Sequence, residues 1–487
     1  MTDNMHGWQE RIRTAEERAQ EESRQDDWRL RHHLMPPVGW LNDPNGLCQK
    51  DGVYHIYFQY SPFDAEGGEK YWGHYESEDL VHWRYTGAFL APDTEWDRSG
   101  VYSGCALMED GKQYFYYTGN VKLEGKHDYI RSGREANTVL TVSEDGRTAG
   151  KKELLMTSRD YGSDMTLHVR DPKVWKENGL YYMVQGARDM EDKGCALVFV
   201  SEDGRNWSRK NVLRKESLDT YMWECPDIFL LEGKRIFSFS PQGMKAEEYR
   251  WQNQYQSGYC LLDGDFTAED GYRLGDFREW DMGFDFYAPQ TFEDEQGRRI
   301  LIGWMGMIEC DYDNMPTVKR GWQHCLTIPR ELVWDEERGI VLQRPVQEME
   351  ALRGASEEYR EESSLEWNRS EGLELHISSV SSGEGTGGLH LEAGGLRLDY
   401  EKENGVLTLA FTDRSGSGRK QRKARIGALK SARIFLDASA AEIYINGGET
   451  VMSTRFYPEK DFLSLKITVE NGTVLVYHLK NMEIDRI

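Results

Sequence analysis

The sequence of 487 residues is poor in cysteine and has no long apolar run. Its seven cysteines, an odd number, stand at scattered positions without a Cys-x-x-Cys pair. A disulfide framework or a zinc site is therefore not expected, and a reducing cytoplasm is the expected location. Residues 1–30 carry no apolar stretch, so we expect no signal peptide, and no later segment is long enough to span a membrane.

Positive charge is also in short supply. The chain has 60 Lys and Arg against 84 Asp and Glu, a net charge of −24. Nucleic-acid phosphates and anionic membranes should repel such a chain, so neither is an expected partner. A phosphorylated substrate would need a local basic patch.

Aromatic residues, by contrast, are plentiful. They make up 12% of the chain, with 15 Trp and 26 Tyr. Flat rings suit a β-rich fold or a carbohydrate site, although core packing alone could account for many of them.

Five segments of the chain share one pattern, in which a short apolar strand, a glycine turn and an aromatic-rich strand follow each other. Their turn glycines are Gly52, Gly111, Gly179, Gly233 and Gly297. Repeated β-units of about sixty residues predict a five-bladed β-propeller over residues 31–343. A pair of β-sandwiches with accidental similarity is the alternative.

The flanking regions differ from these repeats. Residues 1–30 are predicted to be a helical extension, with a polar helix over 8–28 that either lies on the main domain or dimerises. Residues 344–354 read as a linker. Residues 355–487 alternate apolar and polar positions in short runs, which indicates an antiparallel β-sandwich. The predicted fold class is therefore all-β.

The repeats also predict a site. The first strand of each propeller blade lines the central channel, so the residues that begin the five segments should converge at one end of it. They are Asp43, Ser103, Asp171, Glu224 and Ala288. Three are carboxylates, whose mutual repulsion raises the pKa of at least one, as a general acid requires. A hard-cation site is the rival interpretation, but Arg170 beside Asp171 would oppose a cation.

Several short motifs resemble those of glycoside hydrolase family 32, the invertases and fructanases. They cover roughly residues 31–350 in the family's order, and LDASAAEIYINGGE (436–449) resembles the family's C-terminal sandwich. The motifs are WLNDPNG (40–46), YFQYSP (57–62), WGH (72–74), YSG (102–104), RDP (170–172), EC (224–225) and LTIPREL (326–332).

The resemblance implies a role for each matching residue. Asp43 would be the nucleophile, Glu224 the acid/base and Asp171 the stabiliser of the transition state. Hydrogen bonds to fructose would come from Asn42, Gln59, Ser103 and Arg170, and packing at the sugar from Trp72, Trp304 and Tyr102, where the family often has Phe.

The implied activity is retaining hydrolysis of the β-fructofuranoside bond of sucrose or sucrose 6-phosphate, without metal or other cofactor. Exo-acting hydrolysis of levan or inulin oligosaccharides is the alternative, and a non-catalytic fructan-binding module a remote one. The chain is expected to be a monomer or a homodimer. If the glucose carries a phosphate, the rim segment Asn120–Asn137 should help to bind it, through Lys122, Lys126, His127, Arg131 and Arg134.

Overall fold

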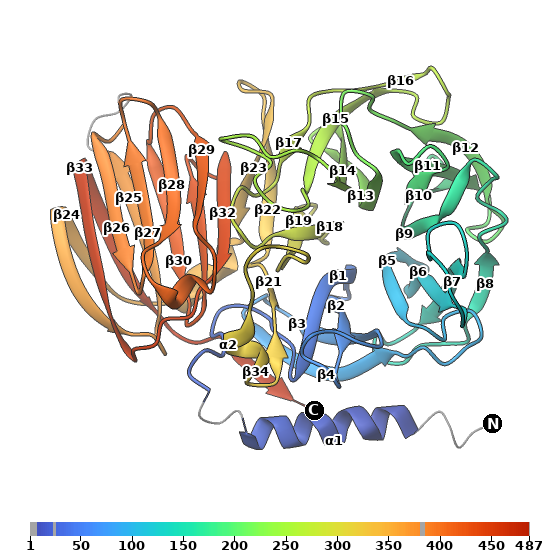
Figure 1. The fold of residues 1–487 in the computed structure, drawn as a ribbon, viewed down its shortest axis with the longest axis horizontal. Coiled ribbons are helices and arrows are strands. Elements are labelled where there is room, and N and C mark those ends of the chain that lie inside the picture. Colours follow the sequence, from blue (N-terminus) through green and yellow to red (C-terminus); the bar gives the residue numbers. More distant parts are fainter. Residues whose placement is uncertain (1–6, 23–25, 380–384, 487) are drawn as a thin grey trace.

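The computed structural model describes residues 7–22, 26–379 and 385–486. They form mostly strands with few helices (Figure 1). The helices are α1 (Gly7–Glu22), α2 (Met315–Val318) and the 3₁₀ turns η2 (Gln347–Leu352) and η3 (Arg414–Gly416). Of the predicted N-terminal extension, residues 1–6 and 23–25 lie outside the described residues, and the described helix ends at Glu22 rather than at residue 28.

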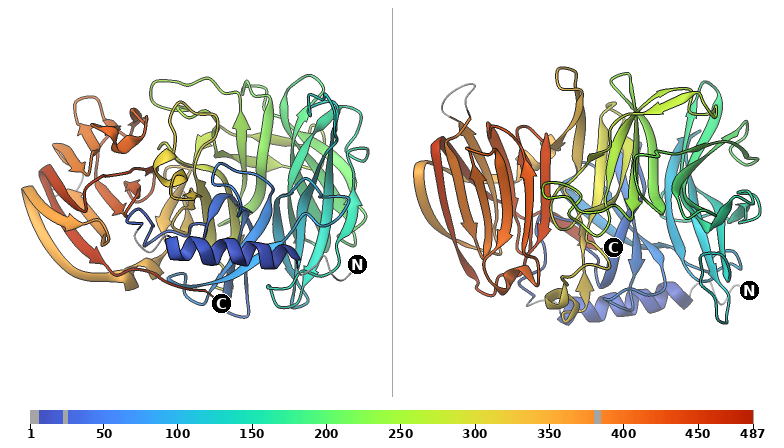
Figure 2. Two further views of the ribbon diagram at one scale, coloured as in Figure 1. Left: turned by 60° about the horizontal axis from the view of Figure 1, so that its bottom comes forward. Right: turned by 45° about the horizontal axis from the view of Figure 1, so that its top comes forward.

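Helix α1 lies along the propeller-like part of the molecule (Figure 2). Ile12 is buried in the core, and the hydroxyls of Tyr60 and Tyr85 both donate to Glu16 Oε1, at 2.9 and 2.6 Å. One face of the helix is therefore occupied by the first sheet, which agrees with the prediction that the helix lies on the main domain.

Strands β1 to β23 form sheets that stand around a common centre in a propeller-like arrangement (Figure 1). The first sheet contains β1 (Gly39–Lys50), β2 (Val53–Ser61), β3 (Tyr71–Ser77), β4 (His82–Leu90), β20 (Trp322–Gln323) and β34 (Glu483–Arg486). The second contains β5 (Val101–Glu109), β6 (Lys112–Lys122), β7 (Arg134–Ser143) and β8 (Glu153–Met156).

The next sheets follow in chain order. The third contains β9 (Met165–Glu177), β10 (Leu180–Asp189), β11 (Gly194–Ser201) and β12 (Ser208–Leu213). The fourth contains β13 (Met222–Leu231), β14 (Lys234–Gln242), β15 (Gly258–Gly264), β16 (Tyr272–Leu274) and β17 (Arg278–Glu279). The fifth contains β18 (Tyr287–Glu293), β19 (Arg299–Met305), β21 (Cys325–Leu326), β22 (Arg330–Asp335) and β23 (Ile340–Pro345).

Each of these sheets begins with the hairpin that its sequence segment predicted. The hairpins pair β1 with β2, β5 with β6, β9 with β10, β13 with β14 and β18 with β19. All five predicted turn glycines have positive φ, between 72° and 82°. Glycine adopts this left-handed conformation without the steric cost that a side chain adds, so the turn position selects it.

The C-terminal strands form one sandwich-like sheet of ten strands. They are β24 (Arg353–Asn368), β25 (Gly372–Ser379), β26 (Gly388–Ala393), β27 (Leu396–Glu401), β28 (Val406–Phe411), β29 (Gln421–Arg425), β30 (Ser431–Leu436), β31 (Ala440–Ile445), β32 (Thr450–Arg455) and β33 (Phe462–Leu479). The long strand β33 pairs with β26 through its first half and with β25 through its second. Residues 380–384 and 487 of the predicted sandwich lie outside the described residues.

The last described strand does not lie where its sequence position predicts. Strand β34 pairs in parallel with β4 of the first sheet, although it falls within the predicted sandwich region 355–487. An outermost strand presents unpaired N–H and C=O groups, and β34 satisfies those of β4. The predicted linker 344–354 likewise overlaps the end of β23 and the start of β24, with η2 between them.

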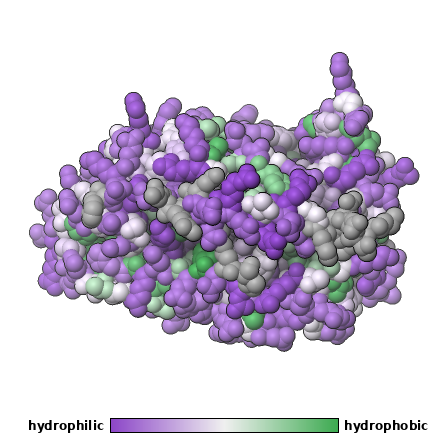
Figure 3. Space-filling model, turned by 90° about the horizontal axis from the view of Figure 1, so that it is seen from below, coloured by the Kyte–Doolittle hydropathy of each residue, from purple (hydrophilic) through white to green (hydrophobic). Residues whose placement is uncertain are grey.

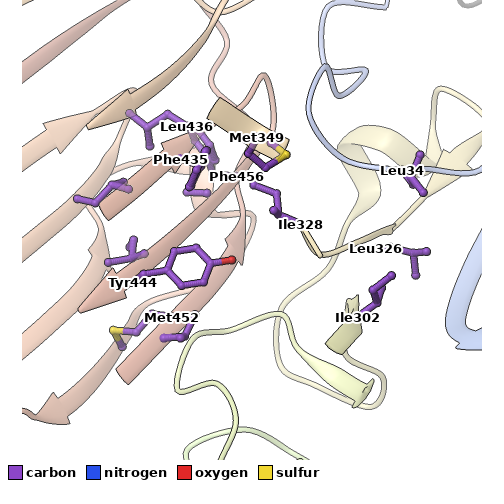
Figure 4. Close-up of a cluster of buried hydrophobic side chains, with 14 of the residues drawn as sticks. Leu34, Ile302, Leu326, Ile328, Met349, Phe435, Leu436, Tyr444, Met452 and Phe456 are labelled. Atoms are coloured by element: carbon purple, nitrogen blue, oxygen red, sulfur yellow. The ribbon is translucent and has the colours of Figure 1, made fainter. Parts of the chain in front are cut away.

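The propeller-like part and the sandwich-like sheet share a continuous hydrophobic core (Figure 4). Residues on both sides contribute to it, among them Leu34, Ile302, Leu326, Ile328, Met349, Phe435, Leu436, Tyr444, Met452 and Phe456. A buried ion network crosses the same boundary, where Arg330 Nη2 lies 2.7 Å from Glu442 and 3.1 Å from Asp281. Because these groups are fully buried, each depends on its partners for compensation.

The surface contrasts with this core. The face in Figure 3 is mostly hydrophilic, with apolar residues scattered over it. Among the described residues, no helix has both the length and the apolar character needed to cross a membrane.

His33 ties the N-terminal segment into the boundary network. Its Nδ1 lies 2.8 Å from Asp437 Oδ2 and its Nε2 3.1 Å from Glu442 Oε1. Burial by itself lowers the pKa of His33, but hydrogen bonds and charge attraction from the two carboxylates outweigh it and raise the pKa to about 9. The protonated ring therefore stabilises the folded state.

We expect this stabilisation to be complete below pH 6.5, to decline above it, and to disappear as the pH passes about 9. The measurement is the free energy of unfolding in urea for wild type and His33→Gln at pH 6 and pH 9.5. The difference between the two proteins should be largest at pH 6. His82→Gln, at an exposed histidine paired with Asp79, is the control and should change little. A His33→Gln difference that does not depend on pH would contradict this account.

Candidate active site

A backbone irregularity marks the positions of the three predicted acids. In β1 the pairing register shifts between Leu41 and Pro44, and in β13 it shifts between Glu224 and Asp227. In β9 it shifts between Arg170 and Lys173, which pair with Gly186 and Val184 of β10. Such β-bulges re-aim a side chain that the regular alternation would place elsewhere. Asp171 also has positive φ, at 62°. The bulges turn acids from separate sheets toward one place.

Asp43 lies at the centre of this site. Its Oδ2 accepts a hydrogen bond of 2.5 Å from Ser103 Oγ, and its Oδ1 accepts one of 3.2 Å from Asn42 Nδ2. Burial raises the pKa of Asp43, and the negative charge of Glu224 raises it further, while the Ser103 and Asn42 hydrogen bonds oppose the shift. The two donors thus help a buried carboxylate to remain charged.

These donors belong to a longer hydrogen-bonded chain. Trp40 Nε1 donates to Asn42 Oδ1 at 2.8 Å, and Asn42 Nδ2 donates to Gln59 Oε1 at 2.8 Å. Gln59 Nε2 in turn donates to Ser103 Oγ at 2.7 Å. The chain fixes the amide orientations of Asn42 and Gln59 and directs the Ser103 hydroxyl at Asp43.

Asp171 is buried beside the same centre. Its Oδ2 accepts the backbone N–H of Cys225 at 3.0 Å, and its own N–H donates to Thr118 Oγ1 at 2.9 Å. The Cys225 thiol lies 3.7 Å from both Asp171 Oδ2 and Asp43 Oδ2, between the two acids. Burial raises the pKa of Asp171 to about 7; Arg170 opposes this, and the charges of Glu224 and Asp43 add to it.

Glu224 has donors on both carboxylate oxygens. Oε1 accepts from Arg170 Nε at 2.9 Å and from Nη2 at 2.6 Å. Oε2 accepts from Gln242 Nε2 at 2.6 Å and from Tyr287 Oη at 2.7 Å. For Glu224 to hold and deliver a proton, one of these donors must turn away, and the Tyr287 hydroxyl can do so by rotation. Three carboxylates with these donors suit acid/base and nucleophilic chemistry.

The predicted aromatic residues differ in where they lie. Trp72 is fully buried, and its Nε1 donates to the Tyr102 carbonyl at 3.1 Å. It therefore lies beneath the site and supports the Tyr102–Ser103 backbone. Tyr102 is partly exposed. Trp304 is 2% exposed, and its ring lies 5.9 Å from that of Trp40.

The sequence motifs did not single out every residue of the site. Lys70 Nζ lies 4.9 Å from the centre of the Trp40 ring, and burial lowers its pKa to about 8 against the attraction of Asp43. Tyr287 and Lys70 stand in no recognised motif. Gln242 ends the second strand of its hairpin, where the repeat itself predicts a residue at the rim of the site.

A second cluster among the described residues could offer metal ligands: His55, His74 and Glu76, with ligand atoms within 4.8 Å of one another. These atoms already have partners. His55 Nδ1 and His74 Nε2 are hydrogen-bonded to each other at 3.0 Å. Glu76 Oε1 is paired with Arg84 and with Arg147, and these positive charges would repel a cation.

Models of known families match almost the whole chain. The N-terminal domain of glycosyl hydrolases family 32 matches residues 33–345, and the C-terminal region of the same family matches residues 348–485. The chain belongs to glycosyl hydrolase family 32. The two matches confirm the resemblance to family 32 that the sequence motifs suggested. By its family, the chain is a glycoside hydrolase.

Relatives in family 32 cover most of the chain. A sucrose-6-phosphate hydrolase of Bacillus subtilis is 38% identical over 89% of this chain and 90% of its own. The structure of a Lactobacillus gasseri sucrose-6-phosphate hydrolase matches with a TM-score of 0.84 at 26% identity, over 96% of both chains. A Bombyx mori family 32 β-fructofuranosidase variant in complex with sucrose matches with a TM-score of 0.83 at 28% identity, over 98% of this chain and 99% of its own.

We expect Asp171→Asn to stabilise the protein at alkaline pH. Because the folded pKa of about 7 exceeds the ordinary 3.8, the buried charge destabilises the fold increasingly between these values and fully above them. The midpoint temperature of unfolding of the variant should exceed that of wild type at pH 8, and the difference should vanish near pH 4.

Asp203→Asn is the matched control for this change. Backbone N–H groups of Asn206 and Arg205 lower the pKa of Asp203 in an exposed turn, so its charge stabilises the fold. The control should lose stability at pH 8. An Asp171→Asn variant that is less stable than wild type at pH 8 would show that the charge of Asp171 does not destabilise the fold.

Proposed function

We propose that this protein hydrolyses the terminal β-D-fructofuranoside bond of sucrose or sucrose 6-phosphate with retention of configuration. The observation that carries the proposal is the meeting of Asp43, Asp171 and Glu224, from three separate sheets, around the Cys225 backbone and thiol. Membership of family 32 and the names of the relatives support the substrate class.

In the first step Asp43 attacks the anomeric C2 of the fructosyl unit while Glu224 protonates the glycosidic oxygen. The C2–O bond breaks, the glucosyl part leaves with the proton of Glu224, and an ester joins C2 to Asp43. The Ser103 hydroxyl donates to Asp43 Oδ2 and Asn42 Nδ2 donates to Oδ1, and the two hydrogen bonds orient the attacking carboxylate. Asp171 holds ring hydroxyls during the oxocarbenium-like transition state.

In the second step Glu224 removes a proton from water, and the oxygen attacks C2 and displaces Asp43. Two inversions at C2 give net retention, as in other hydrolases that use a nucleophile and an acid/base pair. Tyr287 and Gln242 hold Glu224 Oε2 in place between the steps.

We assign hydrogen bonds to the fructose hydroxyls to Asn42, Gln59, Ser103 and Arg170, and a packing contact to the partly exposed ring of Tyr102. We assign Trp72 and Trp304 to positioning, because both rings are buried.

The architecture that we propose for this function is a five-bladed propeller over residues 31–343, one blade for each predicted hairpin. An N-terminal extension (1–30), a linker (344–354) and a β-sandwich (355–487) complete it. We further propose that the protein acts without a cofactor, as a monomer or homodimer, in the cytoplasm. The seven free cysteines favour that location.

Variants of the two acids should separate their roles. Asp43→Ala should lower kcat by roughly 10⁴-fold or more, because no fructosyl ester can form. Glu224→Ala should lower turnover of sucrose by about 10²- to 10⁴-fold but retain more activity on a fructoside whose leaving group needs no proton, because only hydrolysis of the ester then lacks Glu224. The measurements are kcat on both substrates and the configuration of released fructose by NMR.

One serine variant provides the control for these losses. Ser103→Ala should reduce turnover of both substrates to the same extent, because it acts on Asp43 and not on the leaving group. Equal, complete loss on both substrates in Glu224→Ala would refute its acid role, and release of inverted fructose would refute retention.

A further inference from the structure

Two cations face each other at one end of the inner strands β6 and β7 of the second sheet. Lys122, the last residue of β6, is paired directly with Arg134, the first residue of β7. Like charges opposite each other on antiparallel strands repel and destabilise the sheet. Arg134 is half-buried and Lys122 is exposed. An anion bound between or beside the two side chains would relieve this repulsion.

Within the described part of the chain, no ion pair or hydrogen bond engages the side-chain nitrogens of either residue. The buried Nε of Arg134 has no hydrogen-bond partner, and Lys122 Nζ lies over the Tyr129 ring, 5.6 Å from its centre. Neighbouring cations differ in this respect. Arg131 and Arg188 both bind Asp192 Oδ1, at 2.7 and 2.8 Å.

Among the described residues, none of the three acids of this segment, Glu124, Asp128 and Glu135, forms an ion pair with Lys122 or Arg134. Asp128 Oδ1 accepts hydrogen bonds from the backbone N–H groups of Ile130, Arg131 and Ser132, at 2.9 to 3.0 Å. This carboxylate oxygen therefore stabilises the turn that contains it. Glu135 follows Arg134 within β7, so its side chain points to the opposite face of the strand. The positive charge of Arg134 and Lys122 is therefore left available to a ligand.

Hydrogen bonds connect this end of β6 and β7 to Glu224. Arg170, which binds Glu224, also donates from Nη1 to His168 Nδ1 at 3.0 Å, and His168 Nε2 donates to the Tyr129 carbonyl at 2.9 Å. The pKa of Arg134 is lowered by burial and by the charge of Arg170, and Glu224 opposes this. The Arg134 guanidinium thus interacts with the charge of Glu224, the group that protonates the leaving sugar in the proposed function.

We propose that Arg134, assisted by Lys122, binds a phosphate group on the leaving sugar, so that the preferred substrates are phosphorylated β-fructofuranosides such as sucrose 6-phosphate. This inference rests on the proposed function. The planar guanidinium can bind two phosphate oxygens in parallel, and it supplies local positive charge in a protein of net charge −24. Arg131, which the sequence placed in the same group, is instead committed to Asp192.

The test compares kcat/KM for sucrose and for sucrose 6-phosphate in wild type, Arg134→Ala, Arg134→Lys and Lys122→Ala. Wild type should prefer the phosphorylated sugar. Arg134→Ala should reduce that preference by roughly ten- to hundredfold, the range for a charge-assisted hydrogen bond. The loss should lie mainly in KM, because the phosphate is bound equally in ground and transition states. Arg134→Lys should retain part of the preference, and high salt should weaken it.

Arg131→Ala is the matched control from the same segment and should leave the preference unchanged. Equal wild-type efficiency on the two sugars, or equal loss on both in Arg134→Ala, would overturn the inference while leaving the hydrolase function in place. Failure of wild type on both sugars would overturn the proposed function and this inference with it.

A further experiment distinguishes a phosphate group on the substrate from free inorganic phosphate as the ligand of Arg134. If inorganic phosphate were the natural ligand, it would change wild-type turnover of sucrose, and Arg134→Ala would abolish that change without altering the preference between the sugars. That result would also contradict the inference.

Discussion

The site depends on keeping three like-charged carboxylates together in a buried place. Burial and mutual repulsion raise the pKa of both Asp43 and Asp171. Directed donors offset this cost: the Ser103 hydroxyl on Asp43, the Cys225 N–H on Asp171 and four donors on Glu224. Such an arrangement persists only if the surrounding backbone cannot relax, because separating the acids would release the strain.

The rest of the fold supplies that rigidity. Each acid stands on a bulged strand within its own sheet, and the sheets are held around the centre by shared cores. The sandwich-like sheet adds to the restraint through the buried pairs of Arg330 with Glu442 and of Arg419 with Asp285. Strand β34 pairs with β4 of the first sheet, which carries Asp43, and helix α1 contacts the same sheet through Glu16. The N-terminal and C-terminal segments thus support the sheet on which Asp43 lies.

Much of this was accessible from the sequence because the pattern repeats. The five turn glycines and the equivalent positions of Asp43, Asp171 and Glu224 follow from a periodic hairpin, and the all-β fold and family 32 are confirmed. Contacts between unrelated segments carry no such period. The place of β34, the burial of Trp72 and the approach of Lys70 to Trp40 depend on how distant strands pack. For the same reason the sequence could count the cations near Asn120–Asn137 but could not tell which of them has an ionic partner among the described residues, as Arg131 does and Arg134 does not.

The central claim is that Asp43 forms a covalent bond to the fructosyl unit. The direct measurement is mass spectrometry of the intact protein and of its peptides, after Glu224→Ala has reacted with an activated fructoside and been rapidly quenched. The leaving group of this fructoside departs without a proton, and the variant hydrolyses the resulting ester slowly. The account predicts a mass increase of one anhydrofructose unit, mapped to the peptide that contains Asp43 and absent when Asp43→Asn is added. A label on the Asp171 peptide, or turnover of the fructoside with no covalent species, would contradict it.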